Sequence, residues 1–323
     1  MGKRYFDPHP FLLQHRTQGS TVKQMSTEKL KLPSYGGQAL IEGVLMRGSH
    51  YLAAAFRDPA GEIHIQTEKL KGLYTSKVAK WPFFRGLVIM WDAIGLGTKY
   101  LTVSANYQTG EDEKIEGPAL FGTLLFSFAL AIALFFLAPA GVAALFQKWF
   151  SITPFLTNLI EGLIRLLLVV GYIWAVGKMP DIRRVFSYHG AEHKTINAFE
   201  AGAELTPENV SKFSLQHPRC GTGFILILVI FSVILFTLIG PLPNIVIRLA
   251  SRVVLLPLLI MVAYEYMRFV ANHLDNPFVR LFSFPGMAMQ KLTTNEPDLK
   301  VLEVAITAFK AMYELENPEK NEG

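Results

Sequence analysis

Four long apolar stretches constrain the fold of this chain more than any other feature of its sequence. They lie at about 118–146, 152–176, 221–239 and 245–264. Each reaches the roughly 20 residues with which an α-helix crosses the hydrocarbon core of a bilayer. The sequence therefore predicts a mainly α-helical, polytopic membrane protein with four transmembrane helices.

Ionisable side chains are few within these stretches. Glu161 and Arg165 in the second stretch are one helical turn apart. We interpret them mainly as a structural ion pair, because an unpaired charge inside a membrane is costly. A transport role is the less favoured interpretation, because the chain has no internal repeat. Arg248 and Arg252 in the fourth stretch are expected to extend toward the outer headgroups.

The composition supports a membrane protein. Hydrophobic residues make up 51% of the 323 residues and charged residues 18%, whereas about a quarter of the residues in a soluble protein are charged. The single cysteine, Cys220, excludes an internal disulfide and agrees with a reducing compartment. The formal net charge of +5 is ordinary for a membrane protein with basic loops, so we expect no specific nucleic-acid binding.

The distribution of basic residues predicts the orientation. Residues 1–117 contain 15 Lys and Arg, while the loop at 178–219 and the tail after residue 264 contain six each. The connection at 147–151 contains only Lys148. By the positive-inside rule, both termini and the central loop are expected in the cytoplasm. The start of the chain is polar, so no cleavable signal peptide is predicted.

The predicted spans divide the chain into six parts. They are a flexible N-terminal tail (1–33), a cytoplasmic Gly-rich segment with a β-hairpin and an interfacial helix (34–117), transmembrane helices 1–2 (118–177), a cytoplasmic loop (178–220), transmembrane helices 3–4 (221–264) and a cytoplasmic C-terminal helical tail (265–323). A polytopic protein with a cytoplasmic α+β portion is therefore expected.

Local patterns predict structure in the cytoplasmic parts. Tyr51–Arg57 and Glu62–Glu68 are typical of two strands around an Asp-Pro-Ala-Gly turn. The four glycines within 35–48 indicate a tight turn or close packing. An interfacial or partly re-entrant helix is predicted from Pro82 to about Tyr107. A final amphipathic helix at about 298–314 should pack on the cytoplasmic domain.

Residues 189–193, His-Gly-Ala-Glu-His, form the one pattern in the chain that suggests a reaction. His189 and His193 are four residues apart, so they lie on one face of a helix and can hold one metal ion. Glu192 stands where a base could deprotonate a water molecule, as in the inverted zincin motif. The pattern predicts a divalent-metal site, with zinc as the expected metal.

A catalytic zinc site requires a third protein ligand. We favour Glu265, at the inner end of the fourth span, with Cys220, His217 and Glu200 as alternatives. Glu200 lies seven residues after His193 on the same helical face, which better suits orienting a histidine than binding the metal. The predicted topology brings all these residues to one membrane depth, which favours a shared site.

Each of these candidate site residues also has a purely structural interpretation. Two histidines and a glutamate at an interface can simply form hydrogen bonds and contact lipid headgroups. A lone cysteine is at least as often a small packing residue as a metal ligand. Glu42 and Arg47, which lie between glycines, suit a substrate clamp and a structural ion pair equally well.

Four segments resemble one known family. They are 37–48, 188–194, 217–222 and 292–297, with the sequences Gly-Gln-Ala-Leu-Ile-Glu-Gly-Val-Leu-Met-Arg-Gly, Tyr-His-Gly-Ala-Glu-His-Lys, His-Pro-Arg-Cys-Gly-Thr and Leu-Thr-Thr-Asn-Glu-Pro. They resemble the YqhQ-like bacterial membrane proteins (domain of unknown function 1385), which are described as candidate metal-dependent enzymes. The resemblance implies a multi-pass protein of the bacterial cytoplasmic membrane. It implies no substrate.

Two functions from different classes follow from these observations. The favoured one is a metal-dependent hydrolase at the cytoplasmic membrane surface that acts on a membrane peptide or a lipid, with the glycine-rich segment forming part of its substrate cleft. The alternative is a non-enzymatic scaffold or biogenesis factor that docks a cytoplasmic or translocon partner. Metal content and a co-purifying partner protein would distinguish the two.

Overall fold

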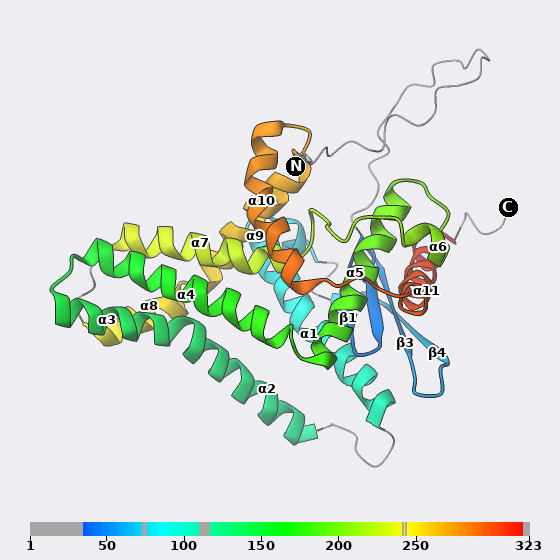
Figure 1. Cartoon of the computed structure of the whole chain (residues 1–323), viewed down its shortest axis with the longest axis horizontal. Coiled ribbons are helices and arrows are strands. Elements are labelled where there is room, and N and C mark those ends of the chain that lie inside the picture. Colours follow the sequence, from blue (N-terminus) through cyan, green and yellow to red (C-terminus); the bar gives the residue numbers. More distant parts are fainter. Residues whose placement is uncertain (1–34, 73–75, 110–116, 241, 243, 319–323) are drawn as a thin grey trace, which may run out of the picture. The chain divides into compact units, whose positions relative to one another are not determined.

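The computed structural model describes residues 35–72, 76–109, 117–240, 242 and 244–318 (Figure 1). The predicted N-terminal tail lies outside these residues. The described chain is mostly helical, with one small β-sheet. Two parts matter for function: an α/β unit built around the sheet, and a group of long apolar helices.

The sheet has four antiparallel strands in chain order, β1 (Gly36–Leu40), β2 (Gly43–Arg47), β3 (Tyr51–Arg57) and β4 (Ile63–Lys69). The last two strands confirm the predicted hairpin. The first two form a second hairpin in the glycine-rich segment, where only a tight turn or close packing was expected. Its turn holds Glu42 in the left-handed region at a φ of 51°.

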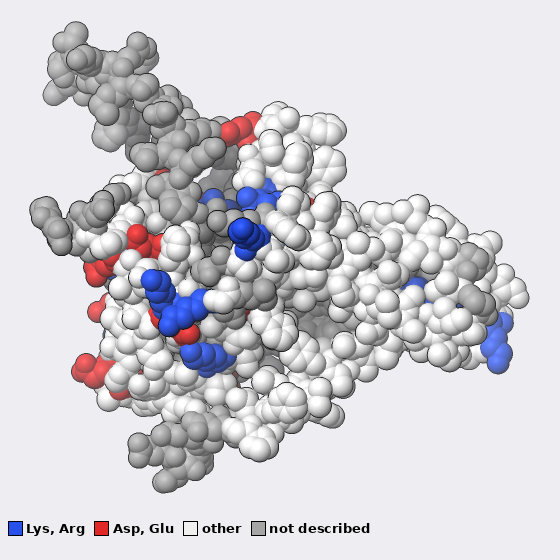
Figure 2. Space-filling model, turned by 180° about the vertical axis from the view of Figure 1, so that it is seen from behind, with Lys and Arg blue, Asp and Glu red and all other residues white. Residues whose placement is uncertain are grey.

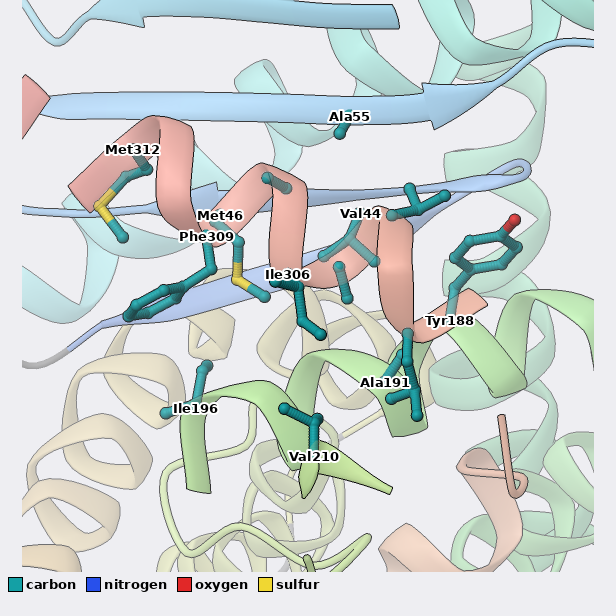
Figure 3. Packing of buried hydrophobic residues seen from close by; sticks show 14 of the residues in the cluster. Val44, Met46, Ala55, Tyr188, Ala191, Ile196, Val210, Ile306, Phe309 and Met312 are labelled. Carbon is teal, nitrogen blue, oxygen red and sulfur yellow. The ribbon is translucent and has the colours of Figure 1, made fainter. Parts of the chain in front are cut away.

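Side chains alternate between the two faces of the sheet, as the period of a strand requires. Val44, Met46 and Ala55 pack on one face with the helices α5 (Pro180–Glu200) and α11 (Leu299–Glu316) (Figure 3). On the opposite face, residues such as Leu45 and Phe56 pack on α1 (Phe84–Thr109) and its residues Leu96 and Tyr100. The sheet is thus the middle of three layers.

The helices α1 and α11 are present at about the predicted residues, while the interfacial or re-entrant placement of α1 stays a prediction. The predicted helix from Pro82 to Tyr107 is α1, and it is not among the helices long and apolar enough to cross a membrane. The predicted C-terminal amphipathic helix is α11. Its buried residues, among them Leu302, Ala305 and Phe309, contact the sheet, as expected for a helix that packs on the α/β unit.

Three helices are long and apolar enough to cross a membrane. They are the continuous helix over Leu120–Phe150, which comprises most of α2 (Gly117–Ile132), a π-helical turn η4 (Ala133–Leu137) and α3 (Ala138–Phe150), together with α4 (Pro154–Val176) and α7 (Thr222–Ile239). A fourth span is possible if α8 (Ile245–Val254) and α9 (Leu256–Asn272), which meet at a 43° bend, act as one. These findings agree with an association with a membrane.

The distribution of charge separates the two parts of the described chain. On the face shown in Figure 2, basic and acidic side chains gather over the part that contains the sheet. The lobe formed by the long helices is almost free of charge until its far end. Many large apolar side chains on these helices are exposed, for example Phe126, Leu167 and Leu238. Exposed apolar surface of this extent is typical of a lipid-facing region.

One prediction about the apolar helices is wrong. Arg252 was expected to extend to the outer headgroups, but its side chain is 2% exposed and pairs with Glu161, with Nη2–Oε2 at 2.6 Å and Nε–Oε1 at 2.8 Å. The reason is that α8 packs against the π-helical turn and brings Arg252 inward. Arg248, by contrast, is half-buried and donates to Gln147 Oε1.

The predicted Glu161–Arg165 pair is present, and it is part of a larger network. Arg165 Nη2 lies 2.8 Å from Glu161 Oε1, and its Nη1 donates to Ser232 Oγ at 2.7 Å. Arg165 Nε donates to the Phe135 carbonyl, in the π-helical turn, at 3.0 Å. Every charged member is almost fully buried, so one carboxylate and two guanidinium groups satisfy one another in an apolar environment.

The remaining helices are η2 (Val78–Lys80), α6 (Pro207–Val210) and α10 (Pro277–Thr293). Pro285 lies inside α10 and does not end it. Gly286 lets α10 approach α7 closely, since a Cβ added at Gly223 of α7 would lie 3.1 Å from Gly286 Cα. The glycine therefore serves close helix packing here and does not end the helix.

Candidate metal site

Helix α5 carries the two histidines of the predicted site. It begins after Met179 with Pro180 at its first position and Asp181 in its first turn, both of which favour a helix start. One face of the helix joins the core of the α/β unit through residues such as Ala191 and Ile196. The histidines project from another face, one turn apart, with ring centroids 4.4 Å from each other.

His189 is oriented by a backbone carbonyl. Its Nδ1 lies 2.8 Å from the Thr293 carbonyl oxygen, and its Nε2 lies 3.2 Å from Cys220 Sγ. A carbonyl only accepts, so Nδ1 carries the proton, and the Nε2 lone pair accepts from the Cys220 thiol. Gly190 makes this approach possible, because a Cβ there would lie 2.3 Å from the Asn295 carbonyl oxygen.

His193 has the same arrangement. Its Nδ1 lies 2.5 Å from the Leu215 carbonyl oxygen, which assigns the proton to Nδ1. Its Nε2 is buried and has no hydrogen-bond partner among the residues that the structure describes. A buried polar atom without a partner costs free energy and is rare in a folded protein. The free lone pair of Nε2 is therefore available for a ligand.

Cys220 completes a group of three ligand atoms. The donor atoms of His189, His193 and Cys220 all lie within 4.8 Å of one another. Tetrahedral zinc with Zn–N of about 2.0 Å and Zn–S of about 2.3 Å places its ligand atoms roughly 3.5 Å apart. The observed separations reach up to 4.8 Å, so the side chains would have to move closer together around a bound zinc ion. Two neutral imidazoles and one thiol form a donor set that suits zinc.

The surroundings of Cys220 leave a little space. A cavity of about 30 Å³ is lined by Cys220, Tyr266 and Gln290, among other residues. This is enough for one or two water molecules. Thr222 donates its backbone N–H to Cys220 Sγ at 3.4 Å, and its hydroxyl lies 3.1 Å from the sulfur. These polar contacts hold the sulfur in place.

Glu192 is buried behind the histidine pair, on the side of strand β1. Burial raises the pKa of its carboxyl group, while His189, His217 and the backbone N–H of Gly37 lower it to a smaller extent. A raised pKa brings a carboxylate closer to the range in which it acts as a general base. Gly37 is packed tightly on it, since a Cβ at Gly37 would lie 2.9 Å from Glu192 Cδ.

His217 lies beside the group of three but is not part of it. Its ring centroid is 5.8 Å from that of His193. Burial lowers the pKa of His217 to about 4, so the ring is neutral at neutral pH. The 3.8 Å between His217 Nε2 and Glu200 Oε2 is then a polar contact and not an ion pair. Gln290 holds the His217 backbone through two hydrogen bonds.

The two acidic candidates for the third ligand have basic partners. Glu265 accepts from Arg85 Nε at 2.7 Å and from the Phe83 backbone N–H at 2.9 Å. It is not in the group of three, although it was the favoured third ligand. Glu200 forms an ion pair with Arg219. The structure therefore brings Cys220, and neither carboxylate, to the two histidines.

Glu42 and Arg47 do not form the ion pair that their spacing suggested. Glu42 accepts both Nε and Nη2 of Arg184, at 2.8 and 2.9 Å, and the hydroxyl of Tyr188 at 3.0 Å. Arg47 instead pairs with Asp92 of α1 at 2.6 Å. The two residues lie at opposite ends of β2 and meet different helices, which explains their separate partners. Glu42 thus ties the sheet to α5.

Several residues that build the site were not singled out from the sequence. The Thr293 and Leu215 carbonyls orient the histidines, and Thr222 contacts the sulfur. Main-chain carbonyls have no residue type, so no sequence pattern could identify them. The Leu-Thr-Thr-Asn-Glu-Pro segment at 292–297, noticed as a family motif, was the one available signal.

Comparison with known proteins agrees with the resemblance seen in the sequence. A family described as "Protein of unknown function (DUF1385)" matches residues 81–315. The "Uncharacterized protein YqhQ" of Bacillus subtilis (strain 168) is 36% identical over 311 residues, which cover 90% of this chain and 96% of the relative. No solved structure matches. Neither description states a reaction or a metal. The match over most of the chain shows that this protein belongs to the DUF1385 family and is of the YqhQ type.

Proposed function

We propose that this protein is an integral membrane metalloenzyme, a zinc-dependent hydrolase at the cytoplasmic surface of the bacterial membrane. One observation carries the proposal. His189 and His193 each direct Nδ1–H to a backbone carbonyl, so that the Nε2 lone pair of each points into the group with Cys220; that of His193 has no partner among the described residues, and that of His189 faces Cys220 Sγ at 3.2 Å. Histidines that bind a metal usually donate their other ring N–H in this way.

The donor set assigns a role to each residue. His189 Nε2, His193 Nε2 and Cys220 Sγ would hold the metal, and a catalytic site with three protein ligands keeps one position open for water. Zinc in such a site lowers the pKa of its water ligand toward neutrality. Glu192 would accept the proton from water, because burial raises the pKa of its carboxyl group above the ordinary range.

The surrounding structure supports a site at a membrane surface. Cys220 lies two residues before α7, one of the three helices able to cross a membrane, and α5 precedes it in the central loop. The basic residues of this loop and of both termini favour the cytoplasmic side. A hydrolase placed there would reach a membrane peptide or a lipid.

Metal analysis tests the proposal directly. Full-length protein is purified in detergent without chelators, and its metal content is measured by plasma mass spectrometry. We expect close to one zinc per chain in the wild type and a loss of it in the His189→Ala/His193→Ala double variant. His273→Ala is the matched control, because His273 also directs Nδ1 to a carbonyl, that of Phe269, but is exposed and outside the group of three.

Two outcomes of the metal analysis would contradict the proposal. Absence of metal from the wild type, even after reloading with zinc, would overturn the enzyme proposal. Equal metal in the wild type and the double variant would overturn the assignment of the ligands. In the first case a non-enzymatic scaffold that docks a cytoplasmic or translocon partner would become the better explanation.

A further inference from the structure

A second and larger cavity is lined by Gly37, the residue that is packed on Glu192. Its volume is about 400 Å³, within the range of small-molecule sites. Its walls come from β1 and β2, from α1, from the last turns of α9 and from the segment around Arg219 and Gly221. Gly37 lines this cavity and also donates its backbone N–H to Glu192. The cavity therefore adjoins the candidate metal site.

The charged side chains in its wall are mainly basic. They are Arg47, Arg219 and Arg268, with Asp92 as the one acidic residue. Arg47 pairs with Asp92, and Arg219 pairs with Glu200 outside the cavity wall. Once these pairs are counted, the positive charge of one guanidinium group is left over. That charge balances the single negative charge of a phosphodiester.

Donor groups in the wall remain available. The hydrogen bonds to the two paired carboxylates engage Nη2 of Arg47 and Nη2 of Arg219, and the Nε atoms of both residues have no partner within the described part of the chain. The side chains of these two arginines are about one third exposed, at 31% and 33%. Arg268 is exposed and makes no hydrogen bond or ion pair with any described residue, although it lies near enough to Glu265 to attract its carboxylate, which is already paired with Arg85. Guanidinium groups are well suited to recognise phosphate.

Asp92 provides a hydrogen-bond acceptor in the cavity wall. Its Oδ1 is buried and has no hydrogen-bond partner among the described residues, although Oδ2 pairs with Arg47. A carboxylate oxygen accepts hydrogen bonds, so it would suit a hydroxyl group on the ligand. Phosphate beside a hydroxyl is the chemistry of a phosphoglycerol headgroup.

The helices that form the cavity wall also carry exposed aromatic side chains outside the cavity, which favour a lipid over a soluble phosphate ester. Trp91 on α1 is 64% exposed and Phe269 on α9 is 55% exposed. Trp81, Phe83 and Phe84, just before and at the start of α1, are also exposed. Exposed aromatic residues at this density are typical of a membrane interface, where headgroup phosphates lie.

We propose that the arginine-lined cavity binds the phosphodiester headgroup of an anionic membrane phospholipid, with Arg47, Arg219 and Arg268 contacting the phosphate and Asp92 accepting from a headgroup hydroxyl. The binding site is independent of the metal. If the protein is the proposed hydrolase, an anionic phospholipid is its substrate class. Only this assignment of the substrate rests on the proposed function; the binding of the headgroup does not.

Lipid retention tests this inference. Full-length protein is reconstituted in nanodiscs that contain phosphatidylcholine and phosphatidylglycerol, and native mass spectrometry identifies the lipids that remain bound. We expect selective retention of phosphatidylglycerol in the wild type. Retention should fall at least about tenfold in Arg47→Gln and in Arg268→Gln, since each loses a charge-assisted contact.

Two controls make the outcome specific. Arg57→Gln removes an arginine that pairs with Glu303, lies outside the cavity wall and also has a buried Nε without a partner, so retention should be unchanged. The Arg268→Gln change breaks no hydrogen bond or ion pair among the described residues and removes only a longer-range attraction to Glu265, so an unchanged melting temperature is expected to accompany the loss of lipid.

A metal-site variant and a soluble competitor show whether lipid retention depends on the metal site and whether the ligand is a lipid. The His189→Ala/His193→Ala variant should still retain phosphatidylglycerol, which would support a headgroup site even if the metal proposal failed. Equal retention of both lipids, or unchanged retention in Arg47→Gln and Arg268→Gln, would overturn the inference. Displacement of the lipid by equimolar soluble glycerophosphoglycerol would overturn the lipid assignment in favour of a soluble phosphodiester.

Discussion

His189 Nε2 and Cys220 Sγ lie 3.2 Å apart although the two residues are 31 positions apart in the chain. The contact joins helix α5 of the α/β unit to the segment that leads into the apolar helix α7. A metal bound there would therefore link the two parts of the described chain.

Replacing the sulfur should change the metal site in a recognisable way. We expect Cys220→Ser to weaken zinc binding by more than the roughly 10–100-fold that loss of an outer hydrogen-bond partner costs. Protein loaded with cobalt should show a thiolate-to-cobalt charge-transfer absorption in the near ultraviolet, and the variant should lack it. A cobalt spectrum that is identical in both proteins would exclude Cys220 as a ligand.

Glu192→Gln should separate metal binding from chemistry. The change removes the base but keeps the size of the side chain, so metal content should stay at the wild-type level. Turnover of the substrate, once one is identified, should fall by about 10²–10⁴-fold, the usual contribution of a general base. Loss of metal from this variant would contradict the assigned role and make Glu192 a ligand.

Gly37→Ala should destabilise the protein, whereas Gly36→Ala should not. A Cβ at Gly37 would lie 2.5 Å from the Leu45 carbonyl oxygen and 2.9 Å from Glu192 Cδ, but a Cβ at Gly36 would meet nothing within 4 Å. Overpacking of this kind costs about 1–3 kcal/mol. Thermal unfolding in detergent would measure it, and equal melting temperatures for the two variants would show that strand β1 can yield.

The buried network should respond asymmetrically to loss of its members. Glu161→Gln leaves two guanidinium groups without a carboxylate and should lower the free energy of unfolding by about 3–5 kcal/mol. Arg252→Met leaves a neutral Glu161–Arg165 pair, so its cost should be smaller. Thermal unfolding of both in detergent tests the order. Glu303→Gln, at an exposed ion pair, is the control and should cost about 0–1 kcal/mol.

The neutral state of His217 makes a prediction about pH. Burial lowers its pKa from 6.5 to about 4, so between these values the unfolded chain binds a proton that the folded protein does not. Stability is then fully present above pH 6.5 and falls as the pH decreases toward 4, by at most about 3 kcal/mol. Metal-free wild type should lose stability over this window faster than His217→Asn. Parallel curves would show that His217 titrates normally.

Much of the fold follows from local patterns in the sequence. The Asp-Pro-Ala-Gly turn and the alternating residues around it predicted the β3–β4 hairpin, and the helical spacing of Leu302, Ala305 and Phe309 predicted α11. The β1–β2 hairpin was missed because its glycines have little strand propensity. β2 pairs with β3, and β1 pairs with β2, so these strands depend on the sheet as a whole and not on local propensity.

In the candidate site, too, local sequence determined one part and tertiary packing determined the other. Spacing four residues apart on a helix brings His189 and His193 together wherever the helix lies, so the sequence alone determined that the two rings would be neighbours. The third member could not be found in this way. Glu265, Cys220, His217 and Glu200 were all reasonable, and only the packing of helices decided that Cys220 reaches the pair while Glu265 meets Arg85.

The sequence by itself determined the apolar stretches, the helices α1 and α11, and the pairing of the two histidines, because each depends on residues close to one another in the chain. The tertiary structure decided the partners of Cys220, Glu265, Arg47 and Arg252. The physical reason is that a charged or ligating side chain takes the partner that packing brings within about 3 Å. That distance depends on how helices far apart in the chain come to lie side by side.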